Sequence, residues 1–61
     1  MVTRYKYFEK FYELQKRKPM LTHRELWEET EEWVIAQIGK PKYTTFGWFR
    51  KEKHIFDYDR Q

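Results

Sequence analysis

Residues 44–60 read TTFGWFRKEKHIFDYDR, and this stretch decides the fold because its pattern fits two different secondary structures. Residues 43–49 and 54–58 are rich in the β-branched and aromatic residues that favour strands. They bracket a polar segment at residues 50–53. Two such runs around a polar tip indicate a hairpin, so we predict a wing-like C-terminal β-hairpin whose tip is charged.

The alternative for this stretch is a helix. A threonine at position 44 or 45 would cap a helix from Phe46 to Lys53, with Phe46 and Phe49 facing inward. A short strand would then begin at His54, and the fold would be a three-helix helix-turn-helix. Gly47 costs such a helix about 1 kcal/mol relative to alanine unless it lies in the first turn, so we place the hairpin ahead of it.

The hairpin prediction also divides the apolar residues between two faces. Successive side chains of a strand point to opposite sides of the sheet. We therefore expect Phe46, Trp48 and Phe56 to share one face and to belong to the core. Phe49 and Ile55 fall on the other face, where they are exposed or covered by a partner.

The chain before this stretch predicts a first helix. No Gly or Pro interrupts it between Arg4 and Arg17, and Pro19 ends it soon afterwards. Apolar side chains recur at steps of three and four, as one face of a helix requires. The residues of this face are Tyr7, Phe8, Phe11 and Leu14.

A second helix has clear start and stop signals. The sequence Thr22-His23-Arg24-Glu25 matches a capping box, and Gly39 suits the left-handed residue that ends a helix. The two helices should pack as an antiparallel or angled hairpin. The predicted fold class is therefore α+β, with two helices followed by the β-hairpin in one small domain over residues 1–61.

Composition limits how this domain is held together and where it works. The chain of 61 residues has no cysteine, so its 13 aromatic residues must supply the core, and association into a homodimer would add buried area. The longest apolar run, Trp33–Ala36, is far shorter than the roughly 20 residues of a membrane span. No signal segment is recognisable at the basic start, and we expect no membrane and a cytoplasmic protein.

No group of residues in the sequence indicates catalysis. Serine and cysteine are absent, and His23 and His54 lie on different predicted elements, where each is interpreted as a solvated polar side chain. Asp57 and Asp59 offer metal ligands near His54, but a strand would turn His54 away from them. We therefore expect a binding protein and not an enzyme, with no cofactor and no metal.

Charge is unevenly distributed along the chain, whose net charge is +3. Residues 1–19 carry six basic and two acidic side chains, residues 20–39 one and five, and residues 40–61 six and three. The acidic residues of the second helix recur at steps of three and four and form a stripe. Its members are Glu25, Glu28, Glu29 and Glu32. Such a stripe fits a solvated face or a docking surface for a basic protein.

The basic, aromatic C-terminal third favours nucleic acid as the partner, with DNA ahead of RNA. The order of helix, glycine turn, Thr-capped segment and strand resembles a winged helix-turn-helix as a pattern, although the second wing strand is missing. We expect an accessory or regulatory protein of transcription, because cations contact phosphates and rings stack on bases. The expected contacts are Lys42, Arg50, Lys51, Lys53 and His54, with Arg4, Lys6 and Lys10 as a second set.

The second functional hypothesis is a protein-interaction module, such as a small inhibitor or adaptor. Its surface would be the acidic stripe of the second helix or the apolar face that carries Phe49 and Ile55. Exposed apolar groups on a small domain mark an interface. The two hypotheses therefore differ in which side of the C-terminal segment is exposed to solvent.

Overall fold

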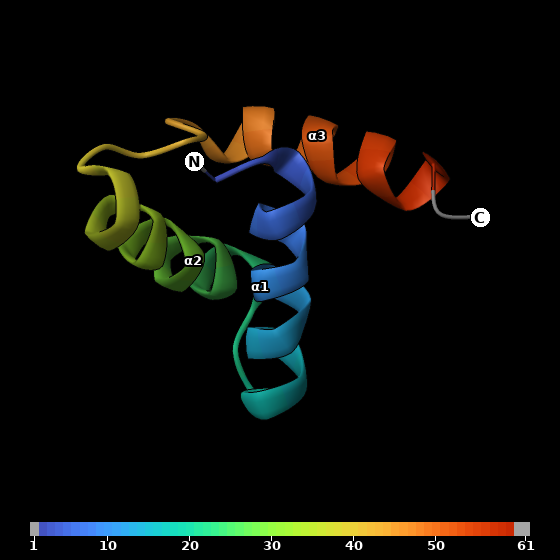
Figure 1. The fold of residues 1–61 in the computed structure, drawn as a ribbon. Coiled ribbons are helices and arrows are strands. Elements are labelled where there is room, and N and C mark those ends of the chain that lie inside the picture. The colour runs from blue at the N-terminus through green and yellow to red at the C-terminus, as the bar shows by residue number, and fades with distance from the viewer. Residues whose placement is uncertain (1, 60–61) are drawn as a thin grey trace.

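The computed structural model describes residues 2–59, which fold into three helices (Figure 1). Helix α1 spans Arg4–Arg17, α2 spans His23–Ile38 and α3 spans Phe46–Asp59. Helix α2 leaves α1 at an angle, and α3 crosses the N-terminal end of α1 (Figure 1). None of the helices in the described part of the chain is long and apolar enough to cross a bilayer.

The ends of α1 and α2 are as predicted. Thr3 accepts a hydrogen bond from the amide of Lys6 at the start of α1. Both bonds of the capping box are present in α2: the Glu25 amide donates to Thr22 Oγ1 over 3.2 Å, and the Thr22 amide donates to Glu25 Oε1 over 2.9 Å. Gly39 closes the helix in the left-handed conformation, with φ of 81°. The capping box and Gly39 act within one turn of chain, which is why the sequence was sufficient to find the ends of α2, whereas the Thr3 cap of α1 was not predicted.

The predicted β-hairpin is wrong, because residues 2–59 contain no strand and α3 occupies its place. The alternative was correct in beginning a helix at Phe46, and Thr45 caps it by accepting from the Trp48 amide over 3.1 Å. However, the helix continues to Asp59 where that alternative placed a strand from His54. The fold is therefore built from helices alone over the described residues.

Packing on α1 explains why this stretch is helical. Phe49 and Phe56 are seven residues apart, so a helix places them on one face, whereas a strand would turn them to opposite faces. Both rings are buried, at 0% and 5% exposure, and both lie against Phe8 of α1, at centroid distances of 5.6 and 5.1 Å. An isolated two-stranded hairpin is marginal in water. The helix is favoured because it buries both rings at once.

Two aromatic residues of α3, Trp48 and Phe49, have the opposite exposure to the one predicted. Phe49 was expected at the surface and is completely buried, while Trp48 was expected in the core and is 47% exposed. Phe56 is buried as predicted, and Phe46 is half-buried against Trp27, with ring centroids 5.6 Å apart. Both errors have one cause, the period of two that the hairpin imposed on a segment with a period of 3.6.

A buried carboxylate fastens the segment between α2 and α3. Glu31 of α2 is only 7% exposed. Its Oε1 accepts from the Tyr7 hydroxyl over 3.0 Å and from the Tyr43 amide over 2.9 Å, and its Oε2 accepts from the Lys42 amide over 3.0 Å. Three donors satisfy the carboxylate inside the protein, as burial of such a group requires. The start of α3 is thereby tied to both other helices.

Candidate nucleic-acid interface

The side of α3 that faces away from the core carries a row of mostly polar and basic residues. Their spacing of three and four places them on one helix face. We call them the α3 stripe: Gly47, Arg50, Lys51, His54, Ile55 and Tyr58. All are exposed except Ile55, which is half-buried, and the first five line a shallow depression in the surface. The stripe is the most continuous basic face of α3.

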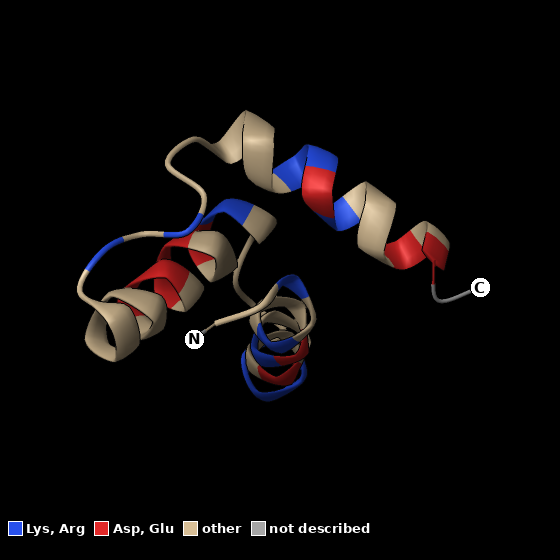
Figure 2. Ribbon diagram, turned by 45° about the horizontal axis from the view of Figure 1, so that its top comes forward, with Lys and Arg blue, Asp and Glu red and all other residues tan. Residues whose placement is uncertain are grey.

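The cations of the α3 stripe have no acidic partner within the part of the chain that the structure describes. Arg50 and Lys51 form no ion pair with any residue between 2 and 59. Glu52 turns towards α1 and pairs with Arg4 over 3.2 Å, and Asp57 pairs with Lys53 over 3.0 Å. Basic residues lie in the middle of α3 and in the loop before it, whereas α2 carries a band of acidic residues (Figure 2). The stripe can therefore offer its charge to an external anion.

Lys53 was predicted to contact phosphates, but it is engaged inside the protein. Its ammonium binds Asp57 and lies 5.6 Å from the centre of the Tyr12 ring, and the Tyr12 hydroxyl donates to the other oxygen of Asp57. Partial burial opposes the charges, yet the hydrogen bonds within the trio raise the pKa of Lys53 and lower that of Asp57. Lys53 therefore joins α3 to α1.

The second predicted set of contacts does not form a free basic patch. Arg4 pairs with Glu52, and Lys10 pairs with Glu13 over 3.3 Å while its ammonium lies over the Trp33 ring. Lys6 is exposed and has no ion pair among the described residues. Only Lys6 of this set keeps a free charge.

The loop before α3 contributes two further cations. Lys42, which was predicted, has its ammonium 5.5 Å from the centre of the Tyr43 ring and its amide bound to Glu31. Lys40, which was not predicted, is exposed and has no ion pair in the described part of the chain. Both precede α3 in a segment held by Glu31. The loop thus adds positive charge to the chain immediately before α3.

The residues predicted for a protein interface are dispersed. Phe49 is buried and cannot contact a partner, and Ile55 lies at the edge of the α3 stripe. The acidic residues are on the outer side of α2, but most are engaged: Glu25 in the capping box, Glu28 with Arg24 at 3.9 Å and Glu29 with Lys18 at 3.2 Å. Glu32 is exposed and has no ion pair among residues 2–59.

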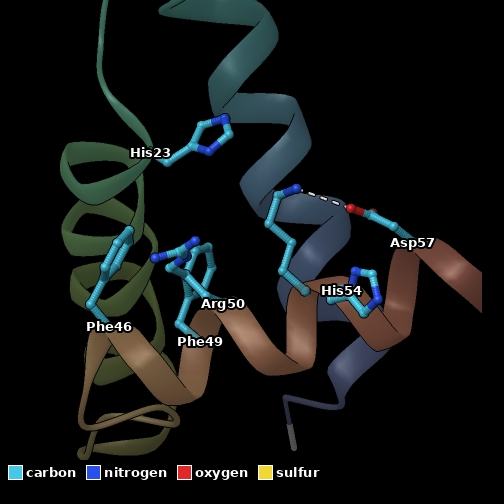
Figure 3. A pocket seen from close by; sticks show the side chains of 7 residues that line it. His23, Phe46, Phe49, Arg50, His54 and Asp57 are labelled. Carbon is cyan, nitrogen blue, oxygen red and sulfur yellow. Dashed lines mark hydrogen bonds and ion pairs between the residues drawn. The ribbon is translucent and has the colours of Figure 1, made fainter.

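A groove beside the α3 stripe was missed by the sequence reasoning. It lies between the start of α2 and α3 and has a volume of about 280 Å³. Its lining residues are His23, Phe46, Phe49, Arg50, Lys53, His54 and Asp57 (Figure 3). The two histidines were interpreted as separate solvated residues, and no spacing in the sequence brings them together. Their proximity depends on how α3 packs against the other helices.

Glu31 was also missed, although the sequence contains a signal for it. It is the acidic residue of α2 that stands outside the exposed acidic stripe, and it precedes the buried Val34 by three positions. That spacing places it on the apolar face of the helix. A carboxylate there must find donors, which it does in the following loop.

No set of three or more His, Cys, Asp and Glu side chains in residues 2–59 is arranged to hold a metal ion. Comparison with known protein families, with curated proteins and with solved structures found no match for this chain.

Proposed function

We propose that the protein binds double-stranded DNA, without catalysis, through the α3 stripe. The observation that carries the proposal is that Arg50 and Lys51 stand exposed on one face of a helix with no acidic partner among the described residues. Phosphate groups are the anions that such cations bind most often in a nucleic-acid complex, and they supply most of its affinity.

The dimensions of α3 suit the major groove. A helix of 14 residues is about 21 Å long, and with its side chains it is about 10–12 Å wide. The major groove of B-DNA is about 12 Å wide and admits one helix. Gly47 has no side chain to hold the backbone away from DNA, and Lys51, His54 and Tyr58 supply hydrogen-bonding groups along the same face.

The distribution of charge over the rest of the protein supports placing DNA against α3. The exposed acidic side chains of α2, among them Glu32, are repelled by phosphates. Lys40 and Lys42 add positive charge to the loop that leads into α3 (Figure 2). DNA is preferred to duplex RNA in this proposal, because the major groove of A-form RNA is too narrow for side chains to enter.

The test is the salt dependence of binding to a DNA duplex, measured by fluorescence anisotropy, for Lys51→Ala and for Lys16→Ala. Lys16 is the matched control, because it is also an exposed helical lysine with no ion pair to any described residue but lies in the last turn of α1. Loss of one phosphate contact lowers the slope of log K against log salt by about 0.9.

We expect that change in Lys51→Ala and not in Lys16→Ala, with circular dichroism confirming that both variants are folded. Absence of duplex binding at low salt, or equal effects of the two substitutions, would contradict the proposal. Tighter binding to single strands than to the duplex would contradict the placement of α3 in a groove.

A second candidate is a protein interaction through the outer side of α2. It is favoured by the free charge of Glu32 next to two exposed apolar side chains, Ile35 and Ile38, on the same helix. This candidate predicts that Glu32→Lys weakens binding to a basic protein ligand and leaves DNA binding intact. It becomes the leading candidate if the duplex is not bound at low salt.

A further inference from the structure

The groove between the start of α2 and α3 gathers basic and imidazole side chains from two helices. Arg50 extends into it beside the rings of Phe46 and Phe49, and His23 reaches over it from α2 (Figure 3). His54 lies along the same wall. These residues line one groove although 27 positions separate His23 from Arg50 in the chain.

Asp57, the acidic residue among the described residues that line the groove, does not neutralise these cations. Asp57 uses one carboxylate oxygen to accept from Tyr12 and the other to bind Lys53. Arg50 consequently has no ion pair within residues 2–59. The groove thus holds an unneutralised guanidinium together with two imidazoles.

We propose that this groove binds a phosphate group. A guanidinium binds phosphate through two parallel N–H bonds, and imidazole N–H groups donate to the remaining oxygens. The volume of about 280 Å³ accommodates a phosphate with part of what it is attached to. The stacked rings of Phe46 and Phe49, with centroids 5.7 Å apart, form the apolar part of the groove wall beside Arg50.

Contacts with α1 orient the imidazole ring of His23. Its Nε2 lies 3.3 Å from the side-chain nitrogen of Gln15 on α1, so the ring is oriented by a contact outside the groove and Nδ1 is left for a ligand. The ring of Phe11 packs on its edge, with centroids 6.0 Å apart. The side chain is therefore positioned by α1 while it reaches over the groove.

The phosphate has two chemical sources. It can be a phosphodiester of the DNA backbone flanking the α3 stripe, and in that form the inference rests on the proposed function. It can also be a free phosphorylated small molecule, and in that form it does not. His23 separates the two, because it belongs to the groove but not to the stripe.

The test is an NMR titration of the folded protein with inorganic phosphate, followed at the side chains of His23 and Arg50. Saturable shifts are expected at both residues. His23→Ala is expected to weaken the apparent affinity by about tenfold, the loss of one charge-assisted hydrogen bond. Arg24→Ala is the control, since Arg24 is exposed, adjacent in sequence and paired with Glu28.

Duplex binding by the same variants identifies the source. Weaker duplex binding in His23→Ala assigns the groove to a backbone phosphate, and unchanged duplex binding with lost inorganic phosphate binding assigns it to a free ligand. The inference is overturned if phosphate causes no saturable shift at His23, or if Arg24→Ala weakens phosphate binding as much as His23→Ala. A failure of Lys51→Ala to affect the duplex bears on the proposed function alone.

Discussion

At the scale of single residues, two neighbouring buried tyrosines differ in whether their hydroxyl groups form a hydrogen bond. Tyr7 and Tyr43 are both buried and their ring centroids are 4.8 Å apart. The Tyr7 hydroxyl donates to Glu31, whereas the Tyr43 hydroxyl has no hydrogen-bond partner in the described part of the chain. The same chemical group therefore stabilises the fold at one position and costs free energy at the other.

Replacing each tyrosine by phenylalanine should give opposite results. Tyr7→Phe removes a bond to a carboxylate and is expected to lower the free energy of unfolding by about 1.5–3 kcal/mol. Tyr43→Phe removes an unpaired buried hydroxyl and is expected to leave that free energy unchanged or to raise it by about 1 kcal/mol. Urea unfolding of the two variants measures both, and equal losses would contradict the difference in pairing.

The same residues predict sensitivity to alkaline pH. Burial, with the neighbouring Glu52 adding to it, raises the pKa of Tyr43 to about 12, and burial and Glu31 raise the pKa of Tyr7 as well. In the unfolded chain a tyrosine titrates near pH 10. The folded state holds these protons more tightly, so the stabilisation is complete below about pH 10 and is lost as the pH rises through about 12.

A pH titration followed by circular dichroism and tyrosinate absorbance checks this expectation. Unfolding and ionisation of the buried tyrosines should occur together above about pH 10. Complete ionisation of all tyrosines with the helices intact would contradict it.

At the scale of elements, local signals were sufficient for two helices and insufficient for the third. The capping box at Thr22 and the glycine at position 39 define α2 by bonds within a single turn. The third segment has β-favouring side chains and a glycine, so its helical state is decided by contacts of Phe49 and Phe56 with α1. Propensity yields to tertiary packing in such segments.

Some residues of the candidate site could likewise be predicted from the sequence, and others could not. Arg50, Lys51 and His54 were predicted as contacts from local charge, and they do lie on one surface. The role of Lys53 and the approach of His23 depend on which helices meet, and sequence spacing does not report that. The assignment of these surfaces to DNA or phosphate stays a prediction.

The two glycines should respond in opposite directions to alanine. Gly39 has φ of 81°, which an alanine adopts only at a cost of about 1–2 kcal/mol. Gly47 lies in the first turn of α3, and a Cβ there would meet no atom within 4 Å, so Gly47→Ala is expected to stabilise α3 by up to about 1 kcal/mol.

Thermal unfolding of both variants measures the difference. Loss of stability in Gly47→Ala would argue against a helix at this position. A duplex-binding measurement on the same variant tests a further point, because a methyl group on the α3 stripe should weaken a close approach to DNA while the fold is strengthened.

At the scale of the whole molecule, stability depends on one small aromatic core. A domain of 61 residues has a free energy of unfolding of roughly 3–9 kcal/mol. The ring of Phe49 lies near the rings of Phe8, Phe11 and Trp27, at centroid distances of 5.6, 5.1 and 6.4 Å. It therefore connects all three helices, since it belongs to α3 and touches both of the others.

Adjacent aromatic residues of α3 should consequently differ in their effect on folding. Phe49→Ala is expected to cost about 3–5 kcal/mol, which is enough to unfold much of the population. Trp48→Ala is expected to cost far less, because Trp48 is 47% exposed and its main ring contact is the edge of Tyr43. Circular dichroism melting curves compare them, and a greater loss in Trp48→Ala would contradict the central position of Phe49 in the core.

The carboxylate of Glu31 has a consequence for the motions of the molecule. Lys42 and Tyr43 lie in a loop, where amide hydrogens ordinarily exchange with solvent quickly, but both amides donate to this one buried side chain. Their exchange should therefore require the opening of the core and proceed as slowly as that of helical amides. The loop between α2 and α3 would then be rigid, and α3 would keep one orientation relative to α2 in solution.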